Sequence, residues 1–255
     1  MFKNSFPARL ILSPSKTFGE IAAGKTSWAW PLGLYTLSIA FSAFLISYLP
    51  AQFLKEAFEG ASLPAGRGFL FYLLVSLPGG LLFSFFICAF LSSLAVFLRA
   101  GRLSLRLPLA ALPAGVCGVL AAAMYASGGF KPAGIAAAAA AAGFAAWPAL
   151  RDKRRFAAIL KAMLSLGAIS IISDLAGSAA ALAGSVKAYA ALEYFFVLVS
   201  LVWLGKATAA VYDTTMPRAA TSAVLAILGS AAFLFLLFNL RLLPEEIFNI
   251  LVLVS

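Results

Sequence analysis

Asp174 is the residue of this chain whose type and position best suit chemistry, because long apolar runs flank it on both sides. An ionisable side chain in the middle of an apolar segment is costly, which makes it a candidate functional site. At helical spacing it shares a face with Ser170 and Ser178, whose hydroxyls would support a carboxylate that binds a proton or a cation. We expect this small, polar face to point into a helix bundle.

A structural role for Asp174 is the alternative. A carboxyl group is tolerated among apolar residues when it is protonated or hydrogen-bonded to a neighbouring helix. We expect no second acid at the depth of Asp174, because Glu193 and Lys206 are placed as interfacial anchors around the next apolar run. A single carboxylate with no histidine nearby favours the structural role.

The remaining residue types offer little further chemistry. Histidine is absent, which removes the commonest metal ligand and the commonest general base at neutral pH. Cys88 and Cys117 lie far apart inside apolar runs and are expected to be buried hydrophobes, not a disulfide or a metal site. The G-x-G-x-x-G motif of dinucleotide-binding proteins, the H-E-x-x-H motif of zinc proteases and the G-x-S-x-G motif of hydrolases are also missing. We therefore expect a non-enzymatic protein with no cofactor and no metal.

The composition indicates a membrane protein. Hydrophobic residues make up 63% of the 255 residues and charged residues only 11%, against about a quarter in soluble proteins. Several apolar stretches are long enough to cross a hydrocarbon core about 30 Å thick. We predict an all-α, polytopic transmembrane helical bundle that forms one integral membrane domain over residues 1–255. Its seven spans lie near 30–49, 69–98, 107–126, 133–150, 157–184, 190–211 and 219–240.

The distribution of cations predicts the orientation of these spans. Of the nineteen Lys and Arg residues, fourteen lie in the N-terminal segment and in alternate links, and five in the other links. Lys and Arg are retained on the cytoplasmic side, so the N-terminus is expected to be cytoplasmic. The cations sit in short links between spans, which suits lipid headgroups and excludes nucleic acid as a partner.

Residues 1–29 are expected to carry a short amphipathic helix in the headgroup region. Ser13 and Pro14 make a typical helix start, and Phe18, Ile21 and Ala22 then recur at i, i+3 and i+4. A disordered tail with a few apolar residues is the alternative for so short a helix.

Three further segments carry specific expectations. A kink or a break is expected at Pro78, which two glycines follow inside a very long span. The alanine-rich run 133–150 is only weakly lipophilic and should pack among other helices. The last residues, 247–255, are apolar but too short to cross, and are expected to lie against the membrane or the bundle.

Two parts of the chain carry a family resemblance. The sequence LSPSKTFGEI at 12–21 precedes the first span, and VWL at 202–204 is followed by RA at 218–219. These segments resemble the Yip (Rab/Ypt-interacting) family of small polytopic membrane proteins, in its prokaryotic branch. The resemblance implies a cytoplasmic N-terminus, a role in membrane organisation through protein contacts, and no catalytic residues. The family has five spans, so the seven predicted here would require one inserted helical hairpin.

The function predicted from the sequence is that of a non-enzymatic, Yip-like membrane protein, acting as a scaffold or as a partner subunit. Its partners would be the lipid bilayer and another membrane protein or a second copy of this chain. The alternative is a small transporter or permease subunit with a midplane site around Asp174. An intramembrane enzyme is disfavoured by the lack of histidine and of paired carboxylates at one depth. The composition and the resemblance indicate a bacterial cytoplasmic membrane.

Overall fold

The computed structural model describes residues 5–50, 53, 56–57, 67–245 and 247–249 and is all-α over these residues. Two short helices, α1 (Phe6–Leu12) and α2 (Pro14–Ala22), precede the bundle. Seven helical segments within the described ranges are long and apolar enough to cross a membrane, which confirms the predicted fold class. They are α3 (Ala29–Tyr48), α5 (Phe69–Leu98), α6 (Leu103–Ser127), α7 (Lys131–Arg151), α8 (Lys153–Ser165) continued by α9 (Gly167–Leu182), α10 (Val186–Tyr212) and α11 (Met216–Asn239).

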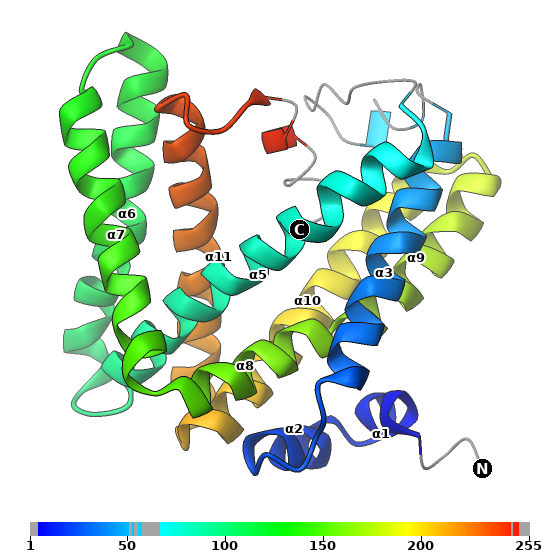
Figure 1. The fold of residues 1–255 in the computed structure, drawn as a ribbon, viewed down its shortest axis with the longest axis horizontal. Coiled ribbons are helices and arrows are strands. Elements are labelled where there is room, and N and C mark those ends of the chain that lie inside the picture. The colour runs from blue at the N-terminus through cyan, green and yellow to red at the C-terminus, as the bar shows by residue number, and fades with distance from the viewer. Residues whose placement is uncertain (1–4, 51–52, 54–55, 58–66, 246, 250–255) are drawn as a thin grey trace.

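The helices form two groups joined by a diagonal one (Figure 1). Helices α6, α7 and α11 stand together on one side, whereas α3, α9 and α10 form the other. Helix α5 crosses between the groups and packs on α3, α7 and α11. Its 30 residues span about 45 Å at 1.5 Å per residue, more than the apolar core of a bilayer, so a tilt is required.

Helix α5 runs without interruption through Pro78, so of the two outcomes predicted there, a kink or a break, the break does not occur. The hydroxyl of Tyr35 on α3 donates a hydrogen bond of 2.5 Å to the carbonyl oxygen of Leu77, next to the proline. Gly80 makes room for this contact, because a Cβ atom there would lie 2.8 Å from the Tyr35 hydroxyl oxygen. Tyr35 thus fastens α3 to the turn of α5 that contains Pro78.

The span predicted near 157–184 is confirmed as one span over Lys153–Leu182, and it contains a turn at Leu166 between α8 and α9. Gly167 begins α9 in close contact with α3: a Cβ atom there would lie 2.8 Å from the carbonyl oxygen of Leu34 and 2.9 Å from Ser38 Oγ. The turn at Leu166 therefore sits where the two backbones approach most closely. Only glycine permits that approach.

Helix α2 begins at Pro14 as predicted, but protein covers its apolar face. Phe18 and Ile21 are almost completely buried, and the ring of Phe18 meets Trp203 of α10 edge-on at 6.3 Å. Arg9 of α1 pairs with Glu20 of α2 at 2.8 Å. Residues 5–22 are thus folded onto the bundle, and neither a disordered tail nor an apolar face in the headgroups describes them.

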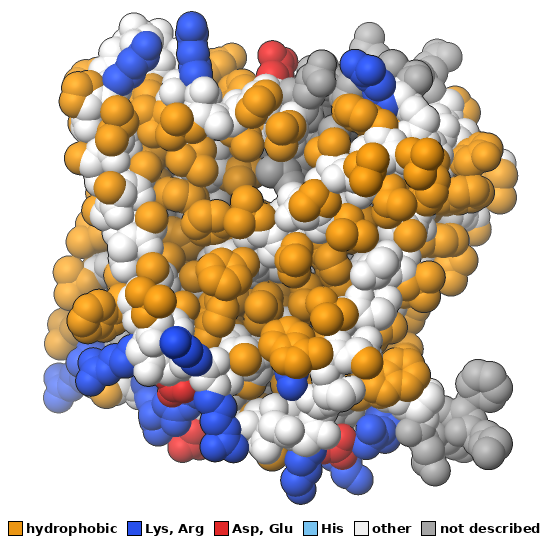
Figure 2. Space-filling view, viewed as in Figure 1, with side chains coloured by type: hydrophobic (Ala, Val, Ile, Leu, Met, Phe, Trp, Pro, Cys, Tyr) orange, Lys and Arg blue, Asp and Glu red, His pale blue; other side chains and the backbone are white. Residues whose placement is uncertain are grey.

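Lys and Arg side chains gather at one end of the molecule (Figure 2). This end carries α1 and α2 and the links α5–α6, α7–α8 and α10–α11 (Figure 1). The links with few cations lie at the opposite end. Lys3 and Lys55, which the count of cations includes, lie outside the described residues. The cation-rich links and the N-terminal helices therefore share one end of the bundle.

The alanine-rich helix α7 is packed on one face only. Its inner face is buried against α5 and α6, and Ser93 Oγ of α5 donates to the Phe144 carbonyl oxygen at 2.6 Å. Its outer face is exposed, so the predicted packing among other helices occurs on the inner face only. The small residues exposed on α7 are Ala133, Ala136, Ala139, Ala140, Gly143 and Ala146.

The C-terminal tail folds back over α11 as far as the structure describes it. The ring of Phe248 stacks on Phe238 with centroids 4.6 Å apart. This contact places residues 247–249 against the bundle, one of the two positions expected for the tail. Residues 250–255 lie outside the described part of the chain.

Candidate functional site

Asp174 lies in the middle of α9 and is partly buried. Its carboxylate oxygen Oδ2 accepts a hydrogen bond of 2.5 Å from Ser42 Oγ of α3. The bond joins two helices that pack closely along their length. A hydrogen bond from a neighbouring helix is the arrangement expected of a structural carboxylate in a membrane.

The two serines predicted to support Asp174 do not contact its carboxylate. Ser170 is exposed on the surface of α9. Ser178 is partly buried, but its hydroxyl donates to the backbone carbonyl of Asp174 at 2.5 Å. The spacing i, i+4, i+8 places Ser170, Asp174 and Ser178 on one helix face but does not predict a bond to the carboxylate. Serine hydroxyls in helices commonly bond the backbone carbonyl one turn back instead. The hydroxyl that bonds the Asp174 carboxylate belongs to Ser42 on α3. Nothing in the sequence around Asp174 points to a residue so far away along the chain.

Glu193 of α10 lies opposite Asp174 in the α9–α10 hairpin. Ser173 Oγ donates to Glu193 Oε1 at 3.3 Å, so the acid faces α9 and is not a boundary anchor. Asp174 is eight residues before the end of α9, and Glu193 is seven residues after the start of α10. Both carboxylates therefore lie about 10–12 Å below the hairpin turn. The assumption that no second acid shares the depth of Asp174 is wrong.

Aromatic rings lie close to this pair of acids. A Cβ atom on Gly177 would lie 3.0 Å from Cε2 of Tyr189 and 3.7 Å from Glu193 Oε1, so these side chains pack directly on the α9 backbone. Tyr189 in turn meets the ring of Phe53 edge-on at 5.5 Å.

We call Ser42, Ser173, Asp174 and Glu193 the carboxylate cluster.

The carboxylate cluster has two acids and no basic partner. Within the described ranges neither Asp174 nor Glu193 forms an ion pair with Lys or Arg. No group of three or more His, Cys, Asp or Glu side chains in those ranges is arranged to hold a metal ion. The free thiols of Cys88 and Cys117 are buried on other helices. What the cluster offers chemically is a place for a proton or a single cation between two carboxylates.

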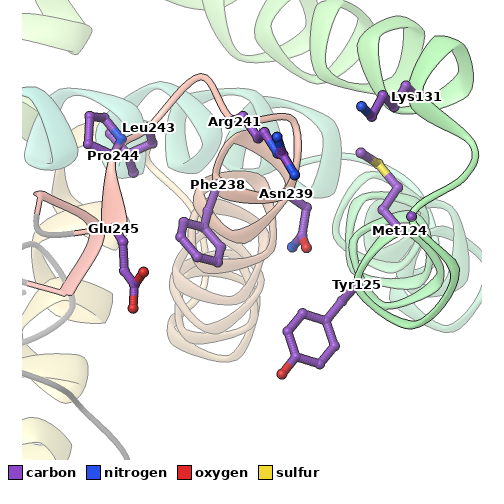
Figure 3. Close-up of a pocket in the computed structure, with 10 residues that line it drawn as sticks. Met124, Tyr125, Lys131, Phe238, Asn239, Arg241, Leu243, Pro244 and Glu245 are labelled. Atoms are coloured by element: carbon purple, nitrogen blue, oxygen red, sulfur yellow. The ribbon is translucent and has the colours of Figure 1, made fainter.

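A cavity of about 550 Å³ lies away from the cluster, between the α6–α7 turn and the end of α11 (Figure 3). Lys131, Arg241 and Glu245 are its charged residues, and Asn239 is a further polar one. This cavity could not be predicted from the sequence, because Lys131 and Arg241 lie in different links, each with a single cation. A second, apolar cavity of about 480 Å³ lies on α6 around Gly115.

Comparisons of the chain with protein-family models, with curated proteins and with solved structures find no match. The resemblance to the Yip family therefore depends on the segments at 12–21, 202–204 and 218–219 alone.

Proposed function

We propose that this membrane protein acts by contacts within the bilayer, as a scaffold or as the partner subunit of another membrane protein. The exposed face of α7 is the observation that carries the proposal. Ala136, Ala140 and Gly143 leave the backbone open there, and nothing lies within 4 Å of a Cβ atom on Gly143. Small residues are the usual means by which membrane helices approach one another, and alanine contributes little to lipid contact.

The carboxylate cluster supports the same proposal. The oxygen Oδ2 of Asp174 bonds Ser42, and Glu193 bonds Ser173, so each acid has a neighbour inside the bundle. The two cavities described above lie elsewhere. An acid that is bonded inside a bundle serves to hold helices together, and chemistry is not needed to explain it.

Affinity purification from native membranes in mild detergent tests this function. The wild-type chain should retain a stoichiometric membrane-protein partner or a second copy of itself. Ala140→Leu should reduce that retention at least several-fold, because a larger side chain separates the helix backbones. Ala231→Leu, at an exposed alanine of α11, is the matched control and should retain the partner. Retention unaffected by Ala140→Leu would remove α7 as the contact.

The proposal includes a cytoplasmic N-terminus in a bacterial inner membrane. The cation-rich end of the bundle supports this orientation, because Lys and Arg are retained in the cytoplasm. The test is labelling of single engineered cysteines at residue 3, in the link 151–155 and in the link 128–130, after replacement of Cys88 and Cys117. Labelling of the first two sites from one side and of the third from the other is expected. Residue 3 and the link 151–155 on opposite sides would overturn it.

Membership of the Yip family is part of the proposal. Its support is that the two resembling segments touch, since Phe18 of α2 packs on Trp203 of α10. Arg218, which begins the third resembling segment, donates to the carbonyl oxygens of Leu98 and Gly101 and so fixes the start of α11 to the α5–α6 link. The resembling residues thus hold the cation-rich end of the bundle together.

A proton- or cation-coupled transporter is the second candidate function. The observation that favours it is the pair of Asp174 and Glu193 at one depth, with no basic partner among the described residues, because two such carboxylates can share a proton. Asp174→Asn and Glu193→Gln keep the shapes of the side chains and remove their charges.

Ion flux in proteoliposomes, driven by a pH gradient, separates the two candidates. A transporter would lose flux in both variants while folding normally, and Ser170→Ala would leave flux unchanged. A scaffold would show no flux above protein-free vesicles in any of them, including the wild type.

A further inference from the structure

We infer that the cavity at the Lys131–Glu245 end of the bundle binds the headgroup of a phospholipid that carries both a phosphate and a primary ammonium group, as in phosphoethanolamine lipids. This inference is independent of the proposed function and of the orientation of the chain. It needs only that the helices cross a bilayer.

The cavity lies where headgroups lie. Lys131 is the first residue of α7, and Asn239 is the last residue of α11, so both line the cavity at the ends of membrane-crossing helices. Tyr125, another lining residue, is 74% exposed, as is usual for an aromatic side chain at the membrane–water boundary. A volume of about 550 Å³ is within the range of small-molecule sites.

Two cations are available for a phosphate. In Figure 3, Lys131 and Arg241 lie on the same side of the cavity, above Met124 and Asn239. Within the described part of the chain, neither cation has an ion pair or a side-chain hydrogen bond. Helix α7 begins at Lys131 with no acidic residue in its first turn and no side-chain cap, so its N-terminus adds partial positive charge. A phosphate suits this side of the cavity.

Glu245 determines which phosphate-bearing headgroup fits best. Figure 3 shows it across Phe238 from the two cations, and it pairs with neither. The Glu245 carboxylate would repel a headgroup that carries only negative charge. An ammonium group would bind the Glu245 carboxylate.

The remaining walls suit the apolar part of a lipid. Met124, Leu243 and Pro244 line the cavity beside Phe238. The stack of Phe248 on Phe238, at 4.6 Å, holds the aromatic wall in place. A charged end and an apolar wall in one cavity match an amphiphile better than a free ion.

Native mass spectrometry of the full chain in mild detergent, with defined lipids added, tests the inference. The wild type should retain phosphatidylethanolamine in preference to phosphatidylglycerol. The double variant Lys131→Gln with Arg241→Gln should bind phosphatidylethanolamine about tenfold more weakly or worse, through loss of two charge-assisted contacts. Glu245→Gln should shift the preference toward phosphatidylglycerol, a readout that does not depend on loss of binding.

The matched control removes the same charges at the other end of the bundle. Lys153→Gln with Arg154→Gln, both exposed, should leave the preference for phosphatidylethanolamine unchanged. Equal retention of the two lipids by the wild type, or equal loss in both double variants, would overturn the inference. Displacement of the lipid by millimolar inorganic phosphate would also overturn it and identify a site for the free anion. Circular dichroism and gel filtration establish that each variant is folded.

Discussion

Ser42 of α3 donates a hydrogen bond of 2.5 Å to the carboxylate of Asp174 on α9, although 132 positions separate the two residues. An ionisable side chain such as that of Asp174 is unfavourable in an apolar segment, but this bond lets it connect two membrane helices. Its strength can be measured against a serine that lies one helical turn from Asp174 and makes no such bond.

Ser42→Ala should lower the free energy of unfolding by about 0.5–2 kcal/mol, because it leaves a partly buried carboxylate without its donor. The midpoint of thermal unfolding in detergent measures the effect. Ser170→Ala, the same change at an exposed position on α9, should leave the midpoint unchanged. Equal midpoints for the two variants would contradict a stabilising role for Ser42.

Gly167→Ala should destabilise the bundle by about 1–3 kcal/mol, because the added methyl group would meet the Leu34 carbonyl oxygen at 2.8 Å. Backbone cannot move aside as a flexible side chain does. Gly143→Ala is the control, since nothing lies within 4 Å of its Cβ position, and alanine there should stabilise α7 by up to about 1 kcal/mol. Opposite shifts of the two unfolding midpoints are expected, and shifts of the same sign would speak against the close contact.

Phe18→Ala should release α2 from the bundle, because Phe18 is fully buried and large-to-small changes of this kind cost about 3–5 kcal/mol. Limited trypsin digestion reads this out: Lys16 and Lys25 are exposed already, but the backbone around them would lose its helical structure and would be cleaved faster. Leu12→Ala, at a position that is 66% exposed, should leave the digestion rate at the wild-type value. Resistance of the Phe18 variant would mean that other contacts hold α2.

Tyr35→Phe should weaken the contact between α3 and α5 by about 1 kcal/mol, because the carbonyl oxygen of Leu77 loses the hydroxyl that bonds it. Hydrogen exchange of α5 amides near Pro78 should become faster in this variant. Tyr125→Phe, which changes an exposed tyrosine on α6, is the control and should leave exchange near Pro78 unaltered. Unchanged exchange in both variants would show that Pro78 needs no support from α3.

The membrane class and the number of spans could be predicted from the sequence because they depend on properties local to each segment. Apolar length determines whether a segment can cross the bilayer, and the cations mark the links between spans. The start of α2 at Pro14 is also a local matter of backbone geometry. Contacts between distant segments could not be predicted in this way.

Each error involved such a contact. Helix α5 continues through Pro78, in a turn where it packs on α3 and where Tyr35 bonds the carbonyl oxygen of Leu77. The span predicted near 157–184 is correct, but its turn at Leu166, where Gly167 meets the backbone of α3, could not be predicted for the same reason. Glu193 was taken for an anchor because a charge near the end of an apolar run usually is one, and only the α9–α10 hairpin places it level with Asp174.

The equal depth of Asp174 and Glu193 also constrains biogenesis. The two helices of a hairpin enter the bilayer together, so both acids must leave water in the same step, at a combined desolvation cost that neither helix offsets alone. Ser42 belongs to α3, which is synthesised before the α9–α10 hairpin and can be inserted in the membrane before it. The order of the segments along the chain thus provides the hydrogen-bond donor of Asp174 before Asp174 itself is synthesised.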